Sequence, residues 1–92
     1  EPGRNYPVPV MKQILIGRSV TACEVSFPDD TAVSAKHCCI REEEGVLILE
    51  DLGSSNGTYL NGERVRTQVK LEDGDILKIG MKELRVTIEK ER

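Results

Sequence analysis

The sequence predicts an all-β domain, a sandwich of two sheets built from about ten or eleven short strands. Apolar and polar residues alternate along several short segments, which is typical of strands with one buried face. No segment shows the apolar period of a helix over ten residues. Turn-forming residues recur between the short segments, as in sandwich folds. These turn signals stand at residues 28–30, 45, 53, 56–57, 61–62 and 73–74.

The strands are predicted in chain order as follows. Residues 6–10 form at most a short edge strand, because the two prolines at positions 7 and 9 cannot donate hydrogen bonds within a sheet. Residues 23–27 and 84–88 alternate in the manner of half-buried strands. Residues 46–49 are a continuous apolar run, which predicts a strand covered on both sides.

Length and composition indicate one small folded domain. The chain has 92 residues, of which 38% are hydrophobic and 32% charged, enough for a modest core without metal or disulfide staples. We expect residues 1–9 to be a linker or short edge strand and residues 10–90 to form the domain. The chain does not begin with an initiator Met, and we therefore expect it to be a piece of a longer protein. Its apolar runs are too short to span a membrane, and the N-terminus lacks the order of a signal peptide, so no membrane role is expected.

The charge of the chain limits the kinds of partner that are expected, and its cysteines indicate the cellular location and bear on metal binding. Thirteen basic and sixteen acidic residues give a net charge of −3, and no basic cluster is interleaved with aromatic residues, which argues against nucleic acid. Cys23, Cys38 and Cys39 are an odd count, which favours free thiols and an intracellular, cytoplasmic location. His37 with the two cysteines that follow it is not a metal site, because consecutive strand residues face opposite sides. We expect neither a metal nor a cofactor.

One loop is the most informative segment of the chain. Residues 54–62, SSNGTYLNG, contain two Asn-Gly pairs, the strongest short signal for tight turns with positive φ. Upstream stand Ile-Gly-Arg at 16–18, Val-Ser-Ala-Lys-His at 33–37 and Asp-Leu-Gly at 51–53, and downstream Leu-Glu-Asp-Gly-Asp-Ile-Leu-Lys-Ile-Gly at 71–80. In order and spacing this set resembles the forkhead-associated (FHA) family over nearly the whole chain, from about residue 14 to residue 88.

The resemblance implies two packed sheets with recognition loops gathered at one end. It also implies a reader that binds a threonine-phosphorylated protein or peptide, or a phosphorylated segment of its own parent protein. A serine/threonine kinase or its substrate is the expected source of that ligand. A phosphate dianion requires a fixed guanidinium, hydroxyl donors and backbone N–H groups. The chain departs from the family by having few residues before Gly17 and by Ala35 directly after the motif serine.

We predict five residues at the phosphopeptide, and the resemblance to the family places four of them there. Arg18 supplies the guanidinium, and Ser34 and Ser55 supply donors to the phosphate. Asn56 has a side-chain amide that both donates and accepts, and so grips the main chain of an extended peptide. The fifth residue, Lys36, compensates for the apolar residue at position 35 if the loop turns it toward the phosphate; the alternative is a solvated lysine on a strand.

Other motif residues are expected to support the loops rather than to contact ligand. These are Gly17, His37, Gly57, Thr58, Asn61 and Gly62.

Two alternatives remain at the level of sequence. The first is a phosphate-independent FHA-like interaction or scaffolding domain that binds through a sheet face. The second is an enzyme with a Ser34–His37 pair. The enzyme lacks support, because no carboxylate that would orient the histidine, no oxyanion-hole motif and no nucleophile elbow is present.

Overall fold

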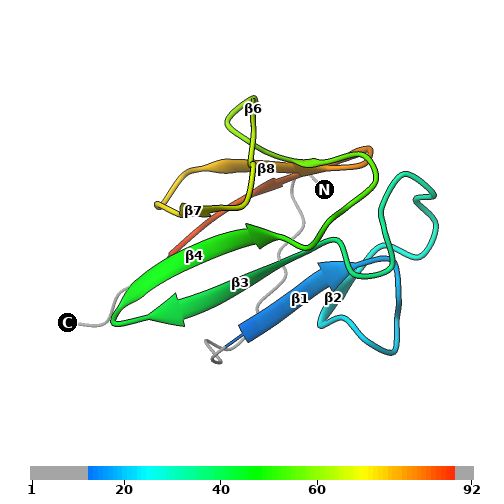
Figure 1. Cartoon of the computed structure of the whole chain (residues 1–92), viewed down its shortest axis with the longest axis horizontal. Coiled ribbons are helices and arrows are strands. Elements are labelled where there is room, and N and C mark those ends of the chain that lie inside the picture. Colours follow the sequence, from blue (N-terminus) through cyan, green and yellow to red (C-terminus); the bar gives the residue numbers. More distant parts are fainter. Residues whose placement is uncertain (1–12, 89–92) are drawn as a thin grey trace.

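The computed structural model describes residues 13–88. These residues form nine strands in two sheets that face one another (Figure 1). The strands are β1 (Gln13–Gly17), β2 (Val25–Ser26), β3 (Cys38–Glu43), β4 (Val46–Asp51), β5 (Thr58–Leu60), β6 (Glu63–Arg64), β7 (Gln68–Lys70), β8 (Ile76–Ile79) and β9 (Lys82–Arg85). The two-sheet all-β architecture is confirmed, with fewer strands in this part of the chain than the ten or eleven predicted. The edge strand expected at residues 6–10 lies outside the described residues.

The first sheet has five strands in the order β2-β1-β3-β4-β7, and the second has four in the order β6-β5-β8-β9. β3 and β4 form the longest hairpin, paired from Cys38 opposite Asp51 to Glu43 opposite Val46. Its two-residue turn has positive φ at both positions, 53° at Glu44 and 81° at Gly45. A turn of this type matches the twist of the strands that it joins. β2 runs parallel to β1, whereas the other strand pairs of residues 13–88 are antiparallel.

The core lies between the two sheets. Leu49 of β4 and Ile79 of β8 have no exposed surface. Cys38 is also fully buried, and this burial raises the pKa of its thiol to about 12, so that the thiol stays protonated. The buried apolar residues of the cluster are Ile16, Val25, Phe27, Val33, Cys38, Leu49, Leu60, Val65, Leu71, Leu77 and Ile79.

Burial along β4 differs from the prediction of a strand covered on both sides. Leu49 is fully buried and the half-buried Leu47 packs against the core, whereas Val46 and Ile48, also half-buried, do not belong to the core cluster. Side chains of a strand alternate between its faces, and in the described structure β4 packs on the second sheet through one face only. A continuous apolar run therefore marks here a strand with a single packed face.

Two predicted strands are shorter than the alternation indicated. Only Val25 and Ser26 of residues 23–27 pair as strand, because the segment before them is a turn in which Cys23 N–H donates to Ser19 O (3.1 Å). β9 ends at Arg85. Beyond it, Val86 N–H donates to Asp75 O (2.8 Å) and Ile88 N–H to Oδ1 of Asp73 (2.8 Å). Residues 86–88 are thus held by a turn rather than by a sheet.

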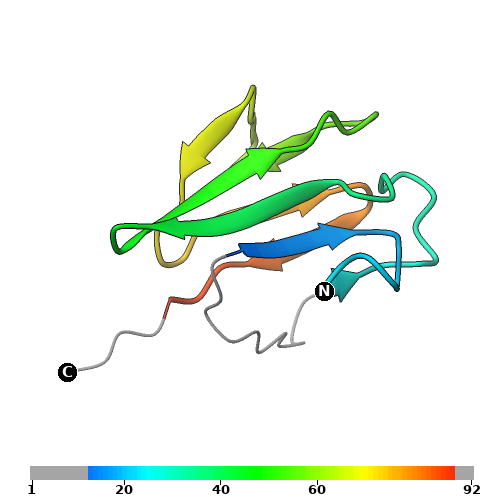
Figure 2. The ribbon, with the colours of Figure 1, turned by 60° about the horizontal axis from the view of Figure 1, so that its bottom comes forward.

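The loops that matter for function gather at one end of the sandwich. They are the connection after β1, the long connection before β3, the β4–β5 connection and the β8–β9 turn, on the right in Figures 1 and 2. Because β1 and β4 both end there, the motif segments at 17–18 and 52–57 are brought together.

Residues 13–88 include no helix of the length and hydropathy needed to cross a membrane.

Candidate functional site

The end of β1 lies directly against the segment that carries the motif serine. Arg18 N–H donates to Ser34 O (2.9 Å), and His37 N–H donates to Ile16 O (2.9 Å). These two hydrogen bonds fix residues 34–37 along the end of the strand. The Arg18 side chain starts beside Ser34 and is exposed.

Gly17 is required by this close approach. A methyl group built on its Cα would lie 2.3 Å from Ala35 O, well inside the contact limit of two atoms. The obstacle is backbone, so it cannot rotate away. Any other residue at position 17 would push the 34–37 segment off the strand end.

Ser34 and Ser55 connect two loops. Ser55 N–H donates to Oγ of Ser34 (3.0 Å). A hydroxyl that accepts one hydrogen bond still has its own proton to donate. Ser34 is therefore held by its neighbour in a position from which it can donate to an anion, and the Ser55 side chain is exposed beside it.

Asn56 is both a brace and an open polar group. Its Nδ2 donates to Ala32 O (2.9 Å), which joins the β4–β5 loop to the segment before Ser34. Within residues 13–88, no partner is present for its Oδ1. The side chain is exposed, so this oxygen can accept from an N–H group of a bound chain.

The side chain of His37 also links these two loops. It has no exposed surface, its Nδ1 accepts from Ser34 N–H (3.0 Å), and its Nε2 donates to Gly57 O (2.8 Å). The N–H can only donate and the carbonyl can only accept, so the ring is the neutral tautomer protonated at Nε2. Both ring nitrogens are engaged with backbone, and neither can take a proton from the Ser34 hydroxyl. The geometry therefore removes the catalytic Ser–His alternative.

Asp51 is a supporting residue that the sequence reasoning missed. Its carboxylate accepts from Oγ of Ser54 (2.6 Å), from Oγ1 of Thr58 (2.6 Å) and from the N–H groups of Gly53 and Ser54 (3.1 and 3.2 Å). Ser54 Oγ in turn accepts from Gly57 N–H (3.0 Å). An Asp two residues before Gly-Ser is the signature of an Asx turn, and this signal was available in the sequence.

These hydrogen bonds set the charge of Asp51. Burial alone would raise the pKa of the carboxyl, but the hydrogen bonds from Ser54, Thr58 and Gly53 outweigh it, and the pKa lies below the ordinary aspartate value. The side chain of Asp51 is thus an ionised carboxylate that accepts hydrogen bonds from the β4–β5 connection.

We expect Asp51→Asn to destabilise the domain by about 1–3 kcal/mol, because an amide can accept only at one of its two atoms. A lowered folded pKa contributes stability that is fully present above the unfolded pKa and is lost as the pH falls through the folded pKa. The wild-type melting temperature should therefore fall in acid, below the ordinary aspartate pKa, and the variant should lose less over that range. Thermal melts from neutral pH into acid measure both effects. Parallel pH profiles for the two proteins would contradict this role.

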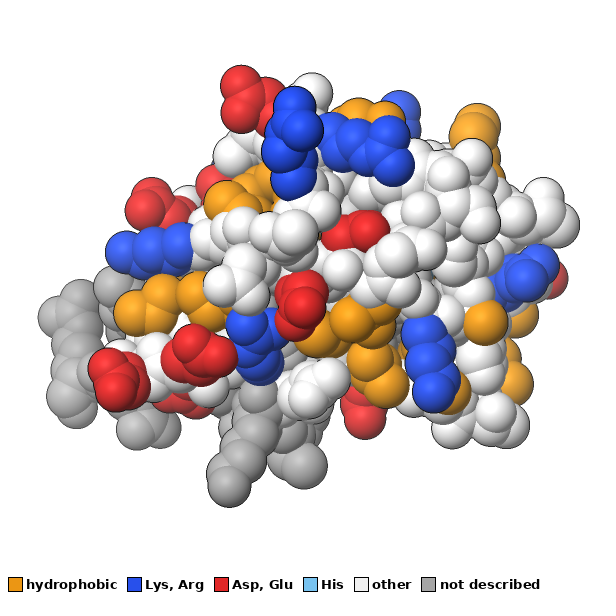
Figure 3. Space-filling model, in the orientation of Figure 1, with side chains coloured by type: hydrophobic (Ala, Val, Ile, Leu, Met, Phe, Trp, Pro, Cys, Tyr) orange, Lys and Arg blue, Asp and Glu red, His pale blue; other side chains and the backbone are white. Residues whose placement is uncertain are grey.

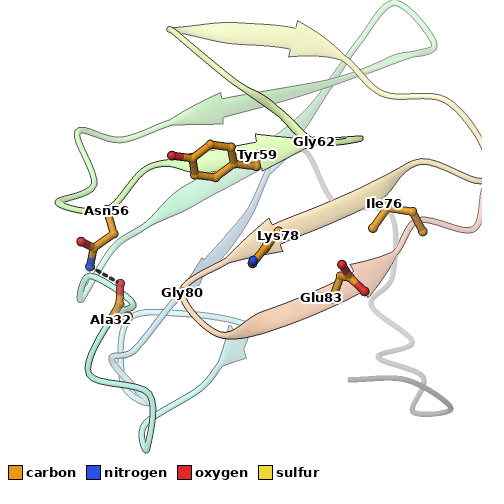
Figure 4. A pocket seen from close by; sticks show the side chains of 8 residues that line it. All are labelled: Ala32, Asn56, Tyr59, Gly62, Ile76, Lys78, Gly80 and Glu83. Carbon is orange, nitrogen blue, oxygen red and sulfur yellow. Dashed lines mark hydrogen bonds between the residues drawn. The ribbon is translucent and has the colours of Figure 1, made fainter.

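The two Asn-Gly pairs play different roles. Asn61 and Gly62 both have positive φ, 52° and 87°, and form the two-residue β5–β6 turn. Asn61 Oδ1 also accepts from Ile76 N–H (2.9 Å), which ties that turn to β8. At the other pair, only Gly57 has positive φ (91°), and no hairpin forms. Gly62 lies at the opposite end of β5 from Asn56 (Figure 4).

The structure thus brings Arg18, Ser34, Ser55 and Asn56 together at the loop end. Lys36 is exposed on the same segment as Ser34, and within residues 13–88 it forms no hydrogen bond with these four residues. No ion pair of the described residues engages Arg18 or Lys36, so both charges are available. In residues 13–88, no group of His, Cys, Asp and Glu side chains is placed to hold a metal ion.

Three comparisons place this geometry among known proteins. An FHA domain-containing protein of Arabidopsis thaliana is 42% identical over 69 residues, which are 73% of this chain and only 18% of that relative. A solved structure of phosphothreonine-dependent FHA domain interactions superposes with a TM-score of 0.85 at 34% identity, covering 98% of this chain and 90% of that one. EmbR of Mycobacterium tuberculosis, solved with a low-affinity phosphopeptide, superposes with a TM-score of 0.88 at 32% identity, covering 99% of this chain and 23% of EmbR.

The family model of the FHA domain matches residues 14–80, which include the ends of β1 and β4 and the loops that carry Arg18, Ser34 and Asn56. With the motif order, the two-sheet fold and the loop geometry in agreement, this chain belongs to the forkhead-associated (FHA) domain family.

Proposed function

We propose that the loop end of this domain binds phosphothreonine within an extended segment of a partner protein, or of its own parent protein. One observation supports this above the others. Ser34 Oγ is held by Ser55 N–H so that its proton is left for a ligand, and the backbone carbonyl of the same residue accepts from the N–H of Arg18, whose side chain is exposed. A fixed hydroxyl donor next to a guanidinium is the arrangement that a phosphate dianion requires.

Each site residue has a distinct part in this proposal. Arg18 pairs with the phosphate, and Ser34 and Ser55 donate to its oxygens. Asn56 accepts from the main chain of the ligand through Oδ1, while its Nδ2 keeps the two loops joined. Lys36 adds a second positive charge on the segment that carries Ser34, in place of the polar side chain that Ala35 lacks.

The domain acts by binding, and its effect is to bring a phosphorylated protein to the rest of its parent chain. The FHA domain with phosphothreonine-dependent interactions and EmbR with its phosphopeptide support this activity for the shared fold. We propose a threonine-phosphorylated kinase or kinase substrate as the partner, in an intracellular compartment, which fits the three free cysteines.

Three matched peptides test the proposal by titration calorimetry. They carry threonine, phosphothreonine or phosphoserine at one position. We expect binding of the phosphothreonine peptide and none of its unphosphorylated copy. The phosphoserine peptide should bind several-fold to about thirtyfold more weakly, because one buried methyl contributes about 0.8 kcal/mol and an empty niche or a freed rotamer adds about as much again. Equal affinity for the threonine and phosphothreonine peptides would instead favour a phosphate-independent interaction domain.

A further inference from the structure

The outer face of the second sheet begins at the proposed site and carries a row of polar side chains. Tyr59 of β5 lies opposite Arg64 of β6 on one side and opposite Lys78 of β8 on the other, and Lys78 lies opposite Glu83 of β9. Residues Thr58 and Leu60 on either side of Tyr59 are buried, so the row faces away from the core.

This row is continuous with the loop that carries Asn56. A methyl group built on Gly57 would lie 2.9 Å from Nε of Arg64 and 3.2 Å from Cε1 of Tyr59. The guanidinium and the phenol ring therefore both stand against the turn that follows Asn56. Figure 3 shows Lys and Arg side chains grouped over β6, the strand that carries Arg64.

The face is also hollowed. A groove of about 480 Å³ runs from the loops onto the sheet. Figure 4 shows Asn56 with Ala32 at its loop end and Lys78 between Tyr59 and Glu83 farther along. Its lining is Ala32, Asn56, Tyr59, Gly62, Ile76, Lys78, Gly80 and Glu83.

The charges of this face are mostly positive. Three of the outward-facing strand side chains of β5, β6, β8 and β9 are basic, Arg64, Lys78 and Arg85, and one is acidic, Glu83. In the described part of the chain, no ion pair engages Arg64 or Lys78. A face with excess positive charge beside an extended-peptide site favours an acidic ligand.

We propose that the row formed by Arg64, Tyr59 and Lys78 determines the sequence specificity of the domain by binding aspartate and glutamate side chains of the phosphothreonine ligand. These acidic residues stand in the flank of the ligand that runs past Asn56 and across the second sheet. The ligand's main chain follows the groove, its methylene groups lie on the Tyr59 ring, and its carboxylates pair with Arg64 and Lys78. This inference rests on the proposed function, because it places the flank by the position of the phosphothreonine.

Three phosphothreonine peptides test the inference by calorimetry at low salt. One has neutral flanks, one has three glutamates before the phosphothreonine, and one has three glutamates after it. We expect one of the two acidic peptides to bind about three- to tenfold more tightly than the neutral peptide, since exposed charge pairs are individually weak. That gain should shrink as salt is raised, because the pairs are solvent-exposed.

Two substitutions in the row and one control test whether the row causes the higher affinity for the acidic peptide. Lys78→Gln and Arg64→Gln should each reduce it and together abolish it, while the neutral phosphothreonine peptide binds as to wild type. Lys70→Gln is the matched control, since it removes the same charge from β7 of the other sheet and should keep the full gain.

A gain that survives the double variant, or that is absent with both acidic peptides, would overturn the inference and leave the proposed function intact. The neutral peptide and its unphosphorylated copy test the proposed function separately. If these two bind equally, the proposed function fails and the inference fails with it.

Discussion

Replacing Arg18 by alanine should weaken phosphothreonine-peptide binding by about 2–5 kcal/mol, roughly thirtyfold to a few thousandfold. The reason is that the phosphate would remain desolvated among Ser34, Ser55 and the loop backbone without its principal countercharge. The stability of the domain should change by less than about 0.5 kcal/mol, because the side chain is exposed and the Arg18 N–H bond to Ser34 O belongs to the backbone. Titration calorimetry and thermal melts measure the two effects.

Two further substitutions sharpen this result. Arg18→Lys keeps the charge but loses the planar fork of donors, so its affinity should lie between those of wild type and Arg18→Ala. Arg66→Ala removes another exposed arginine, in the connection after β6, and this variant should bind as wild type. Undiminished binding by Arg18→Ala would place the phosphate elsewhere on the domain.

His37→Ala should have the largest effect on stability, a loss of about 2–5 kcal/mol, because Ser34 N–H and Gly57 O would lose their partners next to a new cavity. In a domain of this size, such a loss lowers the melting temperature by about 10–30 °C. Phosphopeptide affinity should fall as well, even at temperatures where the variant is folded, since the imidazole fixes both loops relative to each other. Thermal melts combined with calorimetry at low temperature measure both losses.

The hydrogen bonds can be separated from the volume of the ring. His37→Gln retains a donor that can reach toward Gly57 O and should recover part of the stability, whereas His37→Leu fills the space without polar atoms and should recover less. A leucine variant as stable as wild type would mean that the bridge contributes nothing. If His37→Ala instead kept its melting temperature but lost binding, His37 would belong to the ligand site rather than beneath it.

The sequence was sufficient to predict the fold class, and its resemblance to the FHA family identified the four residues that the loops bring together. This worked because the governing signals are local. Alternation marks strands, glycines with positive φ mark turns, and Gly17–Arg18 marks the end of β1. The Ser-x-x-His spacing also placed Ser34 and His37 on one segment.

Burial and strand length were predicted less well, because they depend on which surfaces the other sheet covers. The apolar run of β4 gave no indication that Val46 and Ile48 face away from the core. Alternation at residues 84–88 could not reveal that Val86 N–H pairs with Asp75 O instead of continuing β9.

The hydrogen bonds that hold the site together could not be predicted from the sequence. The bond of Asn56 to Ala32 O and that of His37 to Gly57 O join residues 24 and 20 positions apart. The cross-strand row of Arg64, Tyr59 and Lys78 likewise depends on the register of β5 between β6 and β8. Hydrogen bonding and charge pairing between distant segments follow from how the chain packs, and no local pattern of residue types encodes that packing.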